Sequence, residues 1–129
     1  MSTPDVPESY KQAGLFMLIS GVMNLMVGGV AVLMGLSTCV GTYGLCCFCP
    51  FIGVIPLGFG IHELMVASQM QQGRWIATAK GTNVAGLVIA VLTMSMINIV
   101  LEVLAMVQLG QPEAAKYLEE GAGSAMDWS

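Results

Sequence analysis

The side chains of this sequence most capable of chemistry are a few acids and amides inside long apolar runs. Glu102 is the one acid in the run from Thr82 to Leu109, which contains no base, and Ser95 and Asn98 precede it at helical spacing. An ionisable group that far inside an apolar run is unfavourable in lipid and usually faces protein or water. We therefore expect Asn98 and Glu102 to face neighbouring helices or a polar path.

Two earlier apolar runs each gather small and polar side chains on one helical face, at about 100° of rotation per residue. These residues are Ser20, Asn24 and Gly28 in the first run and Gly53, Gly60 and Glu63 in the second. Small residues at this spacing let helices approach closely, and an amide can hydrogen-bond across the contact. The faces therefore predict helix packing, with a conduction path as the alternative.

Four cysteines lie within eleven residues and invite a metal or disulfide interpretation; they are Cys39, Cys46, Cys47 and Cys49. A structural zinc site normally draws paired ligands from two separate places, and this sequence has no second cluster. We expect no metal. Packing as small apolar side chains is the favoured interpretation, and a disulfide from Cys39 to one of the other three is the alternative. Lipidation of Cys39 is disfavoured because Thr38 precedes it.

The single histidine, His62, follows Gly58 by one helical turn, a spacing that would leave room for a haem or chlorophyll-type ring. A lone histidine is more often hydrogen-bonded or interfacial, so we expect no cofactor. The sequence has neither a Ser, His and acid set at a catalytic spacing nor a phosphate-binding glycine loop. We therefore predict that the protein is not an enzyme.

The composition places these residues in a membrane protein. The chain has 129 residues, of which 56% are hydrophobic and 9% charged, against roughly 25% charged in a typical soluble domain. A soluble fold of this size cannot hide so much apolar surface. We predict an all-α, polytopic integral membrane protein in the lipid bilayer. The net charge of −4 argues against a nucleic-acid partner.

Three transmembrane helices are predicted, over about 14–36, 45–68 and 82–109, followed by a short C-terminal amphipathic helix. A cleavable signal peptide is the alternative for the first span, but its apolar run is too long. The third run would extend roughly 40 Å as a helix, more than the ~30 Å of a hydrocarbon core. A loop inside it would leave two halves too short to cross, so we predict one continuous span.

The polar segments are a leader over 1–13, a connection over 69–81 and a C-terminal segment and tail over 110–129. Lys11, Arg74 and Lys80 lie on one side of three spans, and Lys116 lies on the other. The excess of basic residues on the cytoplasmic side then predicts a cytoplasmic N-terminus and an external C-terminus.

The layout of SGVMNLMVGG, a Cys- and Pro-containing second span ending in GIHELMVA, and QPEAAKYLEE after the third span resembles small multi-pass bacterial membrane proteins of uncharacterised function. The resemblance covers most of the chain and implies a bacterial inner-membrane location without an activity. The cysteine-rich segment and the basic loop also resemble interferon-induced transmembrane proteins. This chain has an additional first span and a different loop, so no function is carried over.

These observations predict a structural or accessory membrane subunit that associates with itself or with other membrane subunits through small-residue helix faces. The alternative is an oligomeric channel or transporter with a polar path lined by Asn24, Asn98 and Glu102. Three spans cannot enclose a pore alone, so this alternative requires a ring of subunits.

Overall fold

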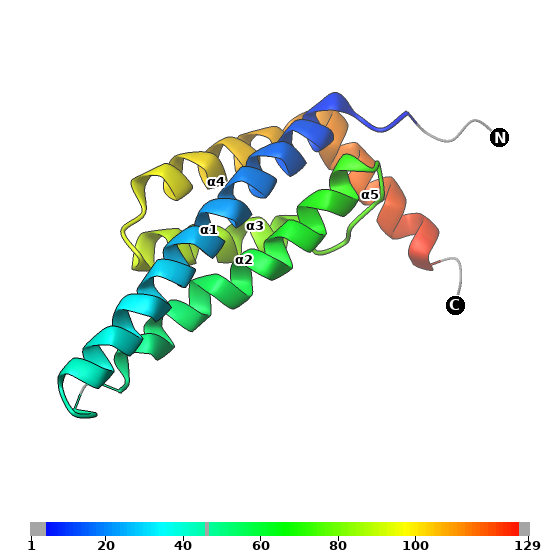
Figure 1. Ribbon diagram of the computed structural model, residues 1–129. Coiled ribbons are helices and arrows are strands. Elements are labelled where there is room, and N and C mark those ends of the chain that lie inside the picture. Colours follow the sequence, from blue (N-terminus) through cyan, green and yellow to red (C-terminus); the bar gives the residue numbers. More distant parts are fainter. Residues whose placement is uncertain (1–4, 46, 127–129) are drawn as a thin grey trace.

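The computed structural model describes residues 5–45 and 47–126, and every regular element in this part of the chain is an α-helix. The all-α prediction is therefore confirmed. The helices are α1 (Glu8–Gly41), α2 (Cys49–Gln71), α3 (Ala79–Leu92), α4 (Met96–Leu109) and α5 (Pro112–Met126) (Figure 1). Only α1 and α2, among the described residues, are long and apolar enough to cross a membrane.

Helices α1 and α2 form a long antiparallel pair held together by glycines. Residues Gly14, Gly21, Gly28 and Gly35 recur every seven positions along α1, and each faces α2. A Cβ atom added at Gly28 would lie 2.6 Å from the backbone nitrogen of Leu57. Gly53 and Gly60 of α2 face α1 equally closely. The two backbones meet directly at Gly28 and Gly35, whereas Gly14 and Gly21 make room for the side chains of Met70 and Leu64.

The predicted third span is wrong, because the run from Thr82 to Leu109 folds as two helices of 14 residues each, α3 and α4. Between them the backbone turns through Met94, which has a φ of 52°. Each helix extends about 21 Å, less than the ~30 Å hydrocarbon core. The antiparallel hairpin brings α4 back against α1, where the polar side chains of α4 form hydrogen bonds with those of α1.

The return of α4 places both terminal segments at the same end of the molecule (Figure 1). The rings of Tyr10 on α1 and Tyr117 on α5 lie 5.0 Å apart between centroids. The Tyr117 hydroxyl donates to the Gly73 carbonyl at 3.1 Å, and the Trp75 indole donates to the Leu118 carbonyl at 3.1 Å. The predicted placement of the N- and C-terminal segments on opposite sides is therefore wrong. With α5 extending to Met126, much of the predicted tail is helical.

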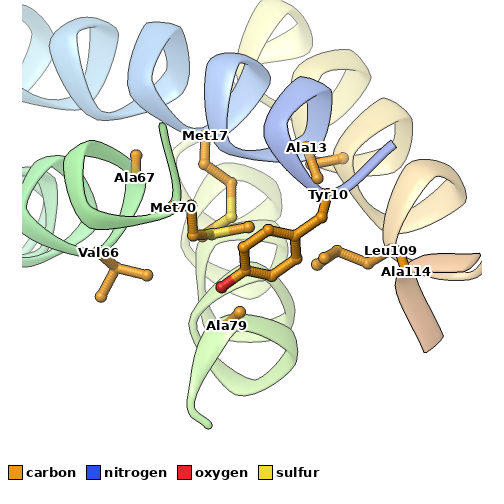
Figure 2. Packing of buried hydrophobic residues seen from close by; sticks show 10 residues of the cluster. Tyr10, Ala13, Met17, Val66, Ala67, Met70, Ala79, Leu109 and Ala114 are labelled. Carbon is orange, nitrogen blue, oxygen red and sulfur yellow. The ribbon is translucent and has the colours of Figure 1, made fainter. Parts of the chain in front are cut away.

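This shared end also contains the apolar core (Figure 2). The fully buried side chains of Tyr10, Met17 and Met70 pack there with Leu109 and Ala114. The Tyr10 hydroxyl donates to the Arg74 carbonyl at 2.9 Å and accepts from the Ile76 amide at 3.0 Å. One phenol thus anchors the α2–α3 connection against the start of α1. Beyond the tip of the α3–α4 hairpin, α1 and α2 continue as a two-helix arm (Figure 1).

Candidate functional site

Six polar side chains meet inside the bundle, and at most 1% of each residue is exposed. They come from all four helices of the two hairpins: Ser20 and Asn24 from α1, Glu63 from α2, Asn83 from α3, and Asn98 and Glu102 from α4. We call these six residues the polar cluster. Because buried polar groups are unfavourable without partners, their hydrogen bonds decide how the four helices fit together.

Glu102 is the best-supported acid of the polar cluster. The Ser20 hydroxyl donates to its Oε1 at 2.7 Å, and the Asn83 amide donates to its Oε2 at 2.6 Å. The same amide donates to the backbone carbonyl of Glu102 at 3.0 Å. Both carboxylate oxygens of Glu102 therefore accept a short, charge-assisted type of hydrogen bond.

A glycine makes the space that the Glu102 carboxyl occupies. Gly86 lies one helical turn after Asn83 on α3, and a Cβ atom there would lie 2.5 Å from Glu102 Oε1 and 2.7 Å from its carboxyl carbon. Any larger residue would displace the carboxyl. The carboxyl therefore lies directly against the backbone of α3, between Asn83 and α1.

Glu63 has fewer donors. The Asn24 amide donates to its Oε2 at 2.9 Å, and the Asn98 amide donates in turn to Asn24 Oδ1 at 2.7 Å. Among the described residues, no donor reaches Glu63 Oε1 or Asn98 Oδ1. The polar cluster thus has two acceptor oxygens without a donor.

Of the residues predicted from the sequence, five belong to the polar cluster: Ser20, Asn24, Glu63, Asn98 and Glu102. Gly28, Gly53 and Gly60 lie in the α1–α2 contact instead. Ser95 occupies the N-cap position of α4 at the hairpin tip, without a side-chain capping hydrogen bond, and is not part of the polar cluster. Sequence reasoning missed Asn83, which meets Glu102 only when the third run folds back on itself.

His62 lies outside the polar cluster. Its side chain is exposed, its Nε2 lies 3.5 Å from the Thr82 hydroxyl, and its ring centroid is 6.2 Å from that of Phe59. No group of three or more His, Cys, Asp or Glu side chains within the described ranges is arranged to hold a metal ion.

Three cysteines, Cys39, Cys47 and Cys49, lie at the far end of the two-helix arm. A disulfide joins Cys39 at the end of α1 to Cys47 in the connection to α2, and Cys49 is free and exposed. Cys46 lies outside the described residues. The disulfide therefore closes the α1–α2 connection at the end opposite to both terminal segments.

No protein-family model, curated protein or solved structure matches this chain. The polar cluster and the outer surface are therefore the features from which a function can be inferred.

Proposed function

We propose that this chain is a small integral membrane protein that serves as a structural or accessory subunit of a membrane complex. One observation carries the proposal. The polar side chains of the bundle bond to one another within one chain, whereas the large side chains of its outer surface are apolar and exposed. Such a surface suits lipid or the helices of a partner, and a self-contained interior suits a rigid building unit.

The surface proposed to meet other subunits is the two-helix arm. The hairpin of α3 and α4 is too short to cover the arm, and five large apolar side chains of the arm are 63–71% exposed. These are Leu33 and Met34 on α1 and Phe51, Ile52 and Ile55 on α2. The small-residue faces suggested by the sequence for this role are occupied within the chain, because Gly28, Gly53 and Gly60 already face backbone.

Two features support an orientation with both terminal segments in the cytoplasm. All four basic residues of the chain, Lys11, Arg74, Lys80 and Lys116, belong to the end that carries the terminal segments. Basic residues favour the cytoplasmic side of a membrane. The Cys39–Cys47 disulfide lies at the other end, and disulfides persist in oxidising compartments outside the cytoplasm.

The channel alternative needs Asn24, Asn98 and Glu102 to face a continuous polar path. In the bundle these side chains are at most 1% exposed, and the amides of Asn24 and Asn98 bond to neighbouring polar side chains. Lining a pore would require these hydrogen bonds to break and the hairpin to leave α1. The accessory role needs no such change, so it is the proposal we favour.

Photo-crosslinking from native membranes tests the arm as a partner surface. A benzoylphenylalanine at Met34 is expected to give one discrete crosslinked protein species, and the same group at exposed Lys116 of α5 is the control. If position 34 gives no protein adduct, or no more than position 116, the arm faces lipid and the proposal fails. Purified protein in liposomes is expected to give no ion flux, and flux abolished by Glu102→Gln would favour the channel.

Orientation is tested separately by thiol labelling of intact cells. A membrane-impermeant maleimide is expected to label Cys49 from outside. A cysteine introduced by Lys116→Cys, in a chain carrying Cys49→Ser, should react only after permeabilisation. Labelling of position 116 in intact cells would contradict the proposed orientation.

A further inference from the structure

The polar cluster contains two acids and no basic side chain. Glu63 and Glu102 are fully buried, and they accept hydrogen bonds from Asn24 and Ser20, which lie one helical turn apart on α1. The side chains that contact them, Ser20, Asn24 and Asn83, are neutral. Two negative charges close together and away from water repel strongly, and carboxyl pairs in this situation share a proton.

The hydrogen bonds of the polar cluster indicate independently that a proton is missing. Glu63 Oε1 and Asn98 Oδ1 are buried acceptors that no donor reaches within the described part of the chain. A buried acceptor without a donor is unfavourable, and one added hydrogen atom would turn Glu63 Oε1 into a donor. Asn98 Oδ1 is the other acceptor of the polar cluster that would gain from an added donor.

We propose that Glu63 and Glu102 form a binding site for one proton, which Glu63 carries while Glu102 keeps the negative charge. Binding forms an O–H bond on one carboxylate oxygen of Glu63, takes the proton from hydronium and leaves water. The pair changes from two negative charges to one. On release, water or a dissolved base accepts the proton.

The assignment to Glu63 follows from the donors. Both oxygens of Glu102 already accept hydrogen bonds, from Ser20 and Asn83. In contrast, no donor in the described part of the chain reaches Glu63 Oε1. A proton there removes a charge from the less supported carboxyl and supplies the missing donor.

A cavity lies beside the site, towards the end of the molecule that carries the terminal segments. It has a volume of about 190 Å³ and lies between the start of α3 and the end of α4. Its lining includes Asn83, which bonds Glu102, as well as Lys80 and Gly110. This cavity is the proposed route by which protons reach the site.

Few other titratable groups face the pair. Lys80 at the cavity is the cation nearest along α3, and His62 of α2 turns toward Thr82. From α1 and α4 only neutral side chains accompany the two acids in the polar cluster. The other acids of the described ranges, such as Glu113, are exposed at the end that carries the terminal segments.

Infrared spectroscopy of the full chain in lipid nanodiscs tests the proposal. At pH 7 we expect the carbonyl band of a protonated carboxylic acid, with an intensity of one proton per chain. The band should shift to lower frequency in D2O and disappear as the pH is raised. Absence of the band, or an intensity of two protons, would overturn the one-proton site. A band that does not shift in D2O would overturn access through the cavity.

Variants locate the proton. The band should vanish in Glu63→Gln and persist in Glu113→Gln, the exposed control. Loss in Glu102→Gln with retention in Glu63→Gln would overturn the assignment. The pH titration of the unmodified chain tests the site even if a variant fails to fold. Replacing choline chloride by sodium chloride should leave the band unchanged, and its loss would indicate a sodium site instead.

Discussion

The glycine contact between α1 and α2 gives the sharpest prediction of stability. Substitution of Gly28 by alanine would place a methyl group 2.6 Å from the Leu57 nitrogen, and 2.9 Å from both the Gly53 carbonyl oxygen and the Leu57 Cα. All three are backbone atoms, so no rotamer change can relieve the contact. The helices must move apart, and the loss of close packing extends to their neighbours.

The adjacent glycine provides a matched control. A Cβ atom at Gly29 would meet no atom within 4 Å. Both substitutions gain up to about 1 kcal/mol from the better helix propensity of alanine. Only Gly28→Ala also suffers overpacking, which typically costs about 1–3 kcal/mol. The difference between the two variants therefore isolates the packing effect.

The free energy of unfolding is measured by SDS titration of protein in dodecylmaltoside micelles, followed by circular dichroism. We expect Gly28→Ala to be less stable than Gly29→Ala by about 1–3 kcal/mol. The same comparison on α2 uses Gly53→Ala against Gly58→Ala, since only Gly58 has open space around it. Equal stability of Gly28→Ala and Gly29→Ala would refute the close contact.

Three further outcomes are expected. Glu102→Gln should lower the free energy of unfolding by about 1–3 kcal/mol, because the amide NH2 group would face the donor of Ser20 or Asn83. Glu63→Gln resembles the protonated acid and should be tolerated, so equal losses of stability in SDS titration would contradict this expectation. Burial raises the pKa of Tyr117 above 10.0. The folded state then holds a proton that the unfolded state releases, so stability should fall as the pH rises past 10.0, more steeply than in Tyr117→Phe. Cys39→Ser should free the thiol of Cys47, so mass spectrometry after maleimide treatment without reductant should show one more labelled thiol in this variant than in the unsubstituted chain. An equal number of labelled thiols would contradict the disulfide.

Hydropathy alone was enough to predict helices in all three apolar runs, and the unfavourable burial of charge was enough to place Asn98 and Glu102 inward. The break near Met94 was not predictable in this way. Positive φ values usually mark glycine or asparagine, and neither is present there. The turn is compensated by contacts made elsewhere, such as the bond between Ser20 and Glu102, which are 82 positions apart. A contact over such a distance cannot be predicted from the residues around Met94.

The glycine contact was predicted only in part. Gly28 was placed on a helical face at the single-helix period of 3.6 residues, whereas Gly14, Gly21, Gly28 and Gly35 repeat every seven. A period of seven is the spacing that keeps one seam of a helix against a supercoiled partner. The disulfide partner of Cys39 stayed undecided because it depends on the turn at Tyr43 and Gly44, both with positive φ.

The short α3–α4 hairpin also bears on how the protein is made. Alone in a bilayer, it would expose the Glu102 carboxyl to lipid, and neither of its helices is long enough to be retained as a span. Ser20 must already be in place to receive it. Since α1 and α2 leave the ribosome first, the order of synthesis supplies the receiving surface before the hairpin needs it. A permuted chain that begins with the hairpin would lose this advantage during biogenesis.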